Sequence, residues 1–251
     1  MSHHAIKVEQ QFGEVASAYL ASSVHSQGAD LDAIADKLRR APDSAVLDLG
    51  CGAGHLSFAA APHVASIVAY DLSADMLRTV AQEAQKRGHG NILTRQGTVE
   101  ALPFPDDSFD FVVTRYSAHH WTEIRTAMKE ARRVLKPGGE FIVVDTCAPE
   151  NPLFDTHLQA IELLRDESHV RNYSLAEWNS MLTDAGFTVT AESTWKLPLD
   201  FTAWITRMRT PDLYVQAISS LLLNAPREVR EYFQVKPDGS FVLDTMMIEA
   251  R

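Results

Sequence analysis

The stretch Val46-Leu47-Asp48-Leu49-Gly50-Cys51-Gly52-Ala53-Gly54-His55 decides the fold of this chain. A short, mainly apolar run predicts a strand, and three glycines at alternate positions predict a tight turn that opens a helix. Glycine has no Cβ, so the backbone of such a turn can approach a ligand closely. The following helix presents free N–H groups and the positive end of its dipole to the same turn. The stretch therefore predicts a ligand site between a strand and a helix.

The spacing of the glycines distinguishes two kinds of nucleotide-like ligand. A dinucleotide fingerprint requires G-x-G-x-x-G, but the position of its last glycine is His55. Asp48 places a carboxylate in the end of the strand. A carboxylate there suits a ligand with an ammonium group and repels a pyrophosphate. An NAD(P)-dependent oxidoreductase is therefore the disfavoured alternative, and a strand-turn-helix without any ligand is a second one.

Size and composition restrict the class of protein. The 251 residues are enough for one sizeable α/β domain. No apolar run approaches the about 18 residues of a membrane span, and the N-terminus lacks the regions of a secretory signal. A formal net charge of −10 without a dense Lys/Arg block argues against a nucleic-acid partner. Two cysteines cannot form a disulfide framework, so we expect a cytoplasmic protein.

The hydrophobic pattern alternates between strands and helices up to Asp145. It predicts strands at Ala45–Leu49, Ser66–Tyr70, Ile92–Arg95, Phe109–Thr114 and Glu140–Asp145. It predicts helices at Val8–Tyr19, Asp30–Arg39, His55–Ala61, Ser73–Lys86 and Thr122–Leu135. Lys136-Pro137-Gly138-Gly139 is a helix stop followed by a turn. Repeated β-α units of this length imply a parallel, doubly wound sheet.

The second half of the chain has a different pattern. Helices are predicted at Leu153–Asp166 and Leu175–Ala185, and strands at Phe187–Trp195 and Ser240–Glu249. The segment between these two strands has helical patterning at Phe201–Arg209, Pro211–Leu223 and Arg227–Phe233. Its apolar residues can form a cap over a ligand, a dimer surface or extra core. These residues are Phe201, Trp204, Ile205, Met208, Leu213, Tyr214, Ile218 and Leu221.

Four stretches together resemble the class I S-adenosyl-L-methionine (SAM) methyltransferases of the UbiE-like type. Asp48-x-Gly50-x-Gly52-x-Gly54 is similar to the first motif of that family, and the segments 102–110 (LPFPDDSFD) and 132–139 (RRVLKPGG) support the match. The segments 115–121 (RYSAHHW) and 168–173 (SHVRNY) more narrowly resemble the YafE-like branch. The resemblance implies a Rossmann-like α/β fold with a seven-stranded sheet of order 3-2-1-4-5-7-6, its last strand antiparallel.

The resemblance also implies how a single domain over residues 1–251 is organised. Residues 1–40 would form an N-terminal helical lid, residues 41–146 the cofactor-binding core, and residues 147–251 the substrate-side half. A helical cap at about residues 197–236 would lie within that half.

SAM is the cofactor that the resemblance implies, with S-adenosyl-L-homocysteine as product. Asp48 would meet the amino group or orient the turn, and Asp71 would accept the ribose hydroxyls or serve as a charge at the start of a helix. Thr98 stands where the family often has an aspartate. Arg115 would meet the methionine carboxylate or form a surface ion pair. The full set is Tyr19, His25 and Gly28 as lid contacts, Asp48, Gly50, Cys51, Gly52, Asp71, Leu72 and Met76 (adenine packing or core), Thr98, Val99, Glu100 and Arg115.

Methyl transfer is a direct displacement, in which positioning alone can contribute about 7–11 kcal/mol. A base is optional, but a neutral imidazole would remove a proton from a hydroxyl or an acidic ring carbon. His119 and His120 follow the fourth strand at the carboxyl edge of the sheet, and we favour His120. The alternative is that one caps a helix before Thr122 and the other is exposed. Weaker candidates are Tyr116, Tyr173, His157 and His169, and no residue spacing predicts a metal site.

The expected function is methyl transfer to a small, apolar or aromatic metabolite, without nucleic acid or a membrane span. A non-catalytic SAM-binding protein is the main alternative. The sequence leaves open the acceptor, the methylated atom and the formation of a homodimer.

Overall fold

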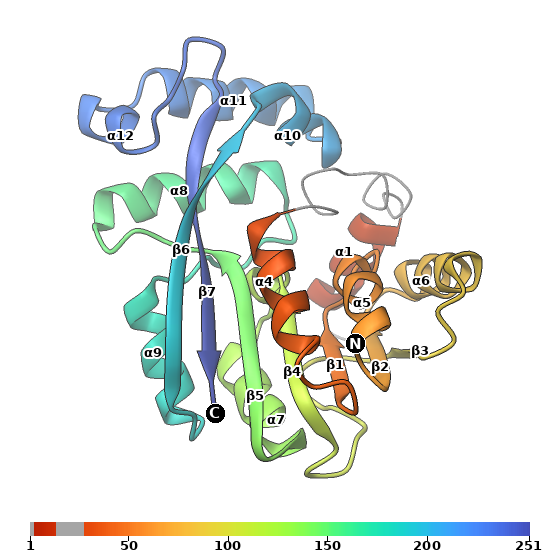
Figure 1. Cartoon of the computed structure of the whole chain (residues 1–251). Helices are drawn as coiled ribbons and strands as arrows, with labels where there is room; N and C mark the ends of the chain where they lie inside the picture. The colour runs from red at the N-terminus through yellow and green to blue at the C-terminus, as the bar shows by residue number, and fades with distance from the viewer. Residues whose placement is uncertain (1–2, 14–27) are drawn as a thin grey trace.

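A seven-stranded sheet forms the centre of the computed structural model, which describes residues 3–13 and 28–251 (Figure 1). The strands are β1 (Ala45–Leu49), β2 (Ser66–Asp71), β3 (Ile92–Gln96), β4 (Phe109–Arg115), β5 (Leu135–Thr146), β6 (Val189–Leu199) and β7 (Phe241–Ala250). Their order is β3-β2-β1-β4-β5-β7-β6. The first five strands run parallel, and β7 is antiparallel to both β5 and β6. The predicted order and the antiparallel last strand are confirmed.

Helices cover both faces of this sheet. The α-helices of the described residues are α1 (His3–Gly13), α4 (Ala29–Leu38), α5 (His55–Ala60), α6 (Ala74–Arg87), α7 (Ile124–Val134), α8 (Pro152–Arg165), α9 (Leu175–Asp184), α10 (Phe201–Arg207), α11 (Asp212–Leu223) and α12 (Arg227–Tyr232). The buried side chains of α4 and α5 contact one face of the sheet, and those of α7 and α9 contact the other. Alternate residues of the strands supply both cores, because successive side chains point to opposite faces.

A third apolar cluster lies above the sheet rather than against its faces. The helices α10, α11 and α12 gather with α8 at one end of the molecule, at the top of Figure 1. Trp204, Ile218 and Val229 of these helices pack with Leu158 of α8 and with Phe241 at the start of β7. We call this group of three helices, α10 to α12, the cap. Because it has its own buried side chains, the cap is more than an extension of the sheet's core.

The start of β5 and the bounds of the first helix are two of the places where the elements differ from the prediction. β5 begins at Leu135, so the predicted turn at Lys136–Gly139 lies inside the strand. The pairing of β4 with β5 shifts there from Phe109↔Leu135 to Phe111↔Glu140, so the glycines form a bulge in a continuing strand. The first helix was predicted at Val8–Tyr19, whereas α1 covers His3–Gly13 and the rest of that range lies outside the described residues.

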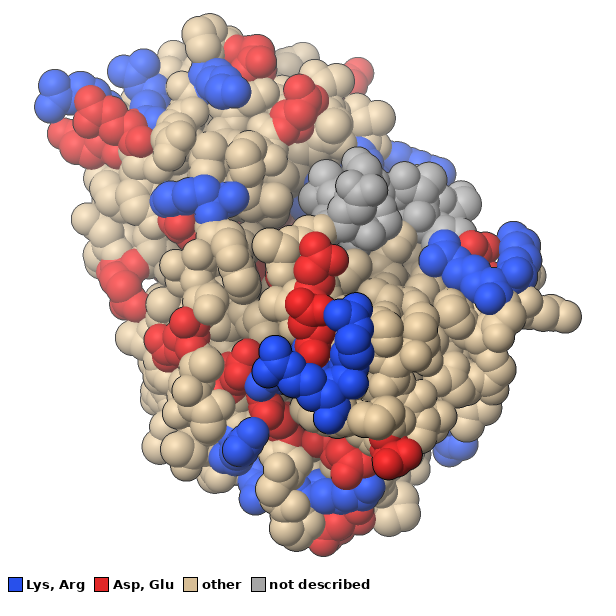
Figure 2. Space-filling view, in the orientation of Figure 1, with Lys and Arg blue, Asp and Glu red and all other residues tan. Residues whose placement is uncertain are grey.

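The described surface mixes charges of both signs. On the face in Figure 2, basic and acidic side chains lie next to one another over the lower half, and no continuous basic band crosses the described part of that face. Among the helices of the described residues, none combines the length and apolar character needed to cross a bilayer. The absence of a nucleic-acid partner stays a prediction.

Candidate active site

A cavity of about 410 Å³ opens at the carboxyl ends of the parallel strands. Its walls come from the loops after β1 to β4, from α1, from the end of α8, and from α10 with the adjoining ends of β6 and β7. Open α/β sheets place their ligands at this edge. Most of the predicted site residues line it: Asp48, Gly50, Cys51, Gly52, Asp71, Leu72, Met76, Thr98, Val99, Glu100, Arg115, His119 and His120.

The glycine turn after β1 has the geometry that its sequence requires. Gly50, Gly52 and Gly54 all have positive φ angles, of 74°, 50° and 85°. A Cβ on Gly50 would lie 2.0 Å from Ser117 Oγ, so a side chain there would collide with the loop after β4. A Cβ on Gly52 would meet nothing within 4 Å. The backbone at Gly52 therefore faces open space in the cavity, as a close approach to a ligand requires.

Two carboxylates, the buried Asp48 and the half-buried Asp71, hold the shape of this turn. The carboxylate of Asp71 accepts hydrogen bonds from the backbone N–H groups of Gly52 (2.8 Å) and Ser73 (2.8 Å). Asp48 accepts one from the Ser57 hydroxyl (2.6 Å) on the helix that follows the turn. Burial raises the pKa of Asp71, and burial together with the nearby charge of Asp71 raises the pKa of Asp48 to about 7. Asp71 thus links the turn to the start of α6.

The loops after β2 and β3 form the neighbouring wall. Met76 is fully buried beneath it, whereas Leu72 and Thr98 are half-buried. The Tyr70 hydroxyl donates a hydrogen bond to the Thr98 carbonyl oxygen (3.0 Å), and the Gln96 side-chain amide donates one to the Leu72 carbonyl oxygen (2.9 Å). Both loops are therefore fixed by contacts of their backbone, which leaves their side chains at the cavity.

Arg115 lines the cavity but already has a carboxylate partner. Its Nε donates to Asp30 Oδ2 (2.5 Å), and the two side chains are only 6% and 10% exposed. The ion pair that the sequence analysis left open is present, but it is buried rather than on the surface. Gly28, a predicted lid contact, is the residue before α4 and is not among the residues that line the cavity. Tyr19 and His25 lie outside the described residues.

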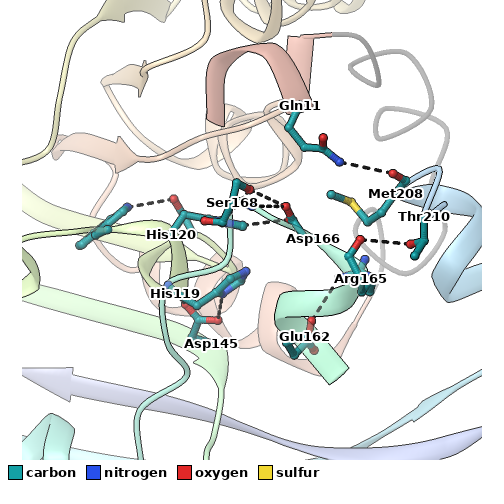
Figure 3. Close-up of polar contacts among 12 residues, drawn as sticks. Gln11, His119, His120, Asp145, Glu162, Arg165, Asp166, Ser168, Met208 and Thr210 are labelled. Carbon is teal, nitrogen blue, oxygen red and sulfur yellow. Dashed lines mark hydrogen bonds and ion pairs between the residues drawn. The ribbon is translucent and has the colours of Figure 1, made fainter. Parts of the chain in front are cut away.

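The two histidines after β4 lie side by side in the short helical turn Ala118–His120. Their ring centroids are 4.2 Å apart, and their side chains are 18% and 11% exposed (Figure 3). The alternative of one helix cap and one exposed histidine is therefore wrong. His119 Nδ1 donates to Asp145 Oδ1 (2.6 Å), and His120 Nδ1 donates to the Ser168 carbonyl oxygen (3.0 Å). Since both Nδ1 atoms donate, the Nε2 atom of each neutral ring is the acceptor.

The surroundings of His119 and His120 shift their pKa values in opposite directions. Burial alone would lower the pKa of His119, but the charge and the hydrogen bond of Asp145 raise it above its ordinary value. Burial and the neighbouring charge of His119 lower the pKa of His120 to about 4. His169, whose ring centroid is 5.8 Å from that of His119, has its pKa lowered to about 2, chiefly by burial. His119 is therefore the most basic of the three rings.

Sequence reasoning missed several residues of this site. Asp145 is the last residue but one of β5, on the same edge as Asp48 and Asp71, and its position alone could have identified it. Asp166 accepts hydrogen bonds from the backbone N–H (2.8 Å) and the hydroxyl (2.6 Å) of Ser168, beside His120. Arg165 and Arg207 line the cavity from α8 and α10, and no local pattern brings those helices together. Of the weaker candidates, Tyr116 lines the cavity, and Tyr173, His157 and His169 do not.

Comparison with known proteins agrees with this geometry. A family described as "Methyltransferase domain" matches residues 47–143. The uncharacterized protein YafE of Escherichia coli K12 is 49% identical over 201 residues, which covers 80% of this chain and 97% of YafE. The uncharacterized methyltransferase YcgJ of Bacillus subtilis is 38% identical over 246 residues, 96% of this chain and 97% of YcgJ. The crystal structure of YcgJ superposes with a TM-score of 0.82 at 36% identity, over 87% of this chain and 97% of that one.

A more distant relative bears on the type of family. The demethylmenaquinone methyltransferase of Lactococcus lactis is 35% identical over 121 residues, 47% of each chain. Fold, cavity and relatives together define a Rossmann-like methyltransferase. The chain belongs to the class I SAM-dependent methyltransferases of the UbiE-like type.

Proposed function

We propose that this methyltransferase transfers the methyl group of SAM to a small molecule held between the histidines and the cap. One observation carries the proposal: a single cavity joins the glycine turn to His119, His120 and the cap residue Trp204. A methyl donor at the glycine turn and a methyl acceptor next to the cap would then lie in the same cavity. The size of the cavity, together with the mixed charge of the described surface in Figure 2, supports a small metabolite rather than a nucleic acid.

The polar groups around the glycine turn are suited to SAM. Open space at Gly52, the carboxylate of Asp71 beside it and the buried carboxylate of Asp48 together match a ligand with a ribose and an ammonium group. When bound, SAM supplies the activated methyl group as a sulfonium. The contribution of the protein is to align donor and acceptor and to exclude water from the cavity.

We assign the removal of the acceptor's proton to His119 rather than to His120. His119 has the raised pKa, an acceptor at Nε2, and a carboxylate on Nδ1 that fixes its tautomer and stabilises its charged form. His120, with a pKa of about 4, is too weak a base for the same role. It shapes the wall, and its carbonyl oxygen accepts a hydrogen bond from His4 Nε2 (3.2 Å) on α1.

The N-terminal helix and the cap enclose the two ends of the cavity in this proposal. His4 and Val8 of α1 line it, which supports a lid within residues 1–40. Leu197, Leu199 and Leu243 give the cap end an apolar wall. That wall and the name of the quinone-methylating relative support an acceptor with an apolar or aromatic body.

Two matched glycine substitutions test the SAM site. Gly52 and Gly88 both have positive φ (50° and 74°) and open space around an added Cβ, but only Gly52 lines the cavity. Gly52→Ala and Gly88→Ala therefore carry similar backbone strain. We expect Gly52→Ala to weaken SAM binding in isothermal titration by about tenfold or more, because a methyl group in a ligand site costs about 1–3 kcal/mol. Gly88→Ala should bind SAM as the unaltered chain does.

Equal SAM affinity in the two variants would refute the assignment of the turn. The same protein is then incubated with methyl-labelled SAM and a bacterial metabolite extract. Labelled product supports the enzyme. Tight SAM binding without any labelled product would favour the alternative of a non-catalytic SAM-binding protein.

A further inference from the structure

The part of the cavity next to the cap contains an arginine, Arg165, whose side chain is fixed beside the cap residue Trp204. We infer that the methyl acceptor carries an anionic group, a carboxylate or a phosphate, that binds to Arg165. This inference rests on the proposed function, because it concerns the acceptor of that reaction. It narrows the acceptor from an apolar metabolite to one with an apolar body and an acidic group.

Arg165, the last residue of α8, is held in one orientation. Its Nε donates to the Trp204 carbonyl oxygen (3.2 Å). Its Nη1 donates to Glu162 Oε2 (3.3 Å), as Figure 3 shows. The guanidinium carbon lies 4.8 Å from the centroid of the Trp204 ring, in a cation–π contact. The side chain is 11% exposed, and Nη2 has no hydrogen-bond partner among the described residues. The terminal nitrogens therefore retain donors for a ligand.

Charges of both signs lie at this end of the cavity, where Arg165 and Arg207 occur together with the carboxylates of Glu162 and Asp166. Asp166 accepts hydrogen bonds from Ser168, and Glu162 accepts one from Nη1 of Arg165. Nη2 of Arg165 is then the nitrogen that can donate to a ligand. A guanidinium N–H forms a charge-assisted hydrogen bond with a carboxylate or phosphate.

A purely structural role for Arg165 predicts something different. The residue also links α8 to the cap through its backbone, because its carbonyl oxygen accepts a hydrogen bond from the Thr210 hydroxyl (3.1 Å). That bond survives a change of the side chain. If the Arg165 side chain served only to attach the cap, its replacement would lower the stability of the fold. It would not selectively weaken binding of the methyl acceptor.

The apolar wall completes the description of the acceptor. Leu197, Leu199 and Leu243 line the same cavity as Arg165, and so does His119. An acceptor with its anionic group on Arg165 would place its apolar body along the leucines. Its nucleophilic atom would then point toward His119 and the donor.

Fractionation of a metabolite extract tests the inference without knowledge of the acceptor. A bacterial extract is separated on an anion exchanger before the reaction, and each fraction is incubated with the protein and methyl-labelled SAM. We expect labelled product only from the retained, anionic fractions. Labelled product from the unretained fractions alone would overturn the inference. No product from any fraction would instead overturn the proposed function, and this inference with it.

Treatment of the active fraction with a phosphatase before the reaction separates the two sources of charge. Loss of the labelled product would indicate a phosphate, and its retention a carboxylate.

Variants of the arginine then connect the charge to the residue. Arg165→Gln should raise the KM for the active fraction about 10- to 100-fold, the range expected for a lost charge-assisted hydrogen bond, with the Kd for SAM unchanged. Arg165→Lys should recover part of the loss because it keeps the charge. Arg171→Gln is the matched control, because Arg171 pairs with Asp155 and Glu177 and does not line the cavity. An unchanged KM in both Arg165 variants, or an equal rise in Arg171→Gln, would overturn the assignment.

Discussion

Replacement of Asp145 by asparagine tests the role of His119 in the most direct way. The substitution keeps the size of the side chain but removes the negative charge that lies 2.6 Å from His119 Nδ1. A hydrogen bond between charged groups contributes about 1.5–3 kcal/mol, and one pKa unit corresponds to about 1.4 kcal/mol. The pKa of His119 should therefore fall by about one to two units.

The sign of the effect on the pH profile follows from the role of the base. His119 accepts a proton only when neutral, so the rate should rise with pH as the ring loses its proton. Because Asp145 raises this pKa, Asp145→Asn should move the acid limb of kcat to lower pH by about one to two units. The plateau rate should also fall, by less than the about 10²–10⁴-fold that loss of a whole base costs.

The assay is the rate of S-adenosylhomocysteine formation with the active acceptor fraction, measured across neutral and acidic pH. Asp184→Asn, which alters an exposed ion pair with Arg125, is the control and should leave the profile unchanged. An acid limb at the same pH in Asp145→Asn would refute the assignment of His119 as the base. A limb displaced to higher pH would do so as well.

Three further predictions concern stability. Gly50→Ala should destabilise the fold by about 2–5 kcal/mol in urea denaturation, because a Cβ would lie 2.0 Å from Ser117 Oγ and alanine disfavours a φ of 74°; an unchanged midpoint would contradict the geometry of the turn. Asp30→Asn leaves the charge of Arg115 buried without this carboxylate, and we expect a loss of up to about 3–5 kcal/mol, measured in the same way. The double variant Asp30→Leu/Arg115→Met removes both charges. A smaller loss of unfolding free energy in this variant than in Asp30→Asn would show that the buried charge is responsible. The pKa of His169 is lowered to about 2, so acidification below its ordinary pKa protonates the unfolded chain but not the folded one, and stability is lost as the pH falls. Between about pH 6 and pH 4, the free energy of unfolding of His169→Gln should therefore fall by about 1.4 kcal/mol less per pH unit than that of the unaltered chain. An equal dependence of this free energy on pH in the variant and the unaltered chain would refute this account.

The sheet and most of the cofactor side could be predicted because their signals are local. The alternation of strands with helices determines a parallel sheet, and the glycine turn at Gly50–Gly54 marks the edge at which a ligand can lie. Asp71 was predictable for the same reason, since it ends the second strand. The start of β5 was not, because Pro137 and the glycines after it predict a turn when their pairing with β4 is unknown.

The acceptor side could not be predicted from sequence because it depends on contacts between distant segments. Arg165 meets Trp204 only because α8 packs against the cap, and His119 meets Asp145 only because β4 and β5 are neighbours in the sheet. The sequence prediction favoured His120 over His119 because UbiE-like enzymes often have a histidine at that position, and no local pattern in this chain separates the two adjacent residues. Their pKa values differ because Asp145, 26 residues after His119, raises the pKa of His119, whereas burial and the neighbouring charge of His119 lower the pKa of His120.

The cap is inserted at the tip of a β-hairpin, between two strands that pair from Val189↔Ala250 to Leu199↔Phe241. An insertion at such a tip leaves the ladder below it in register, whatever its length. The segment 200–240 could therefore be exchanged in evolution while the sheet and the glycine turn after β1 keep their structure. New substrates would become accessible through exchange of one contiguous gene segment.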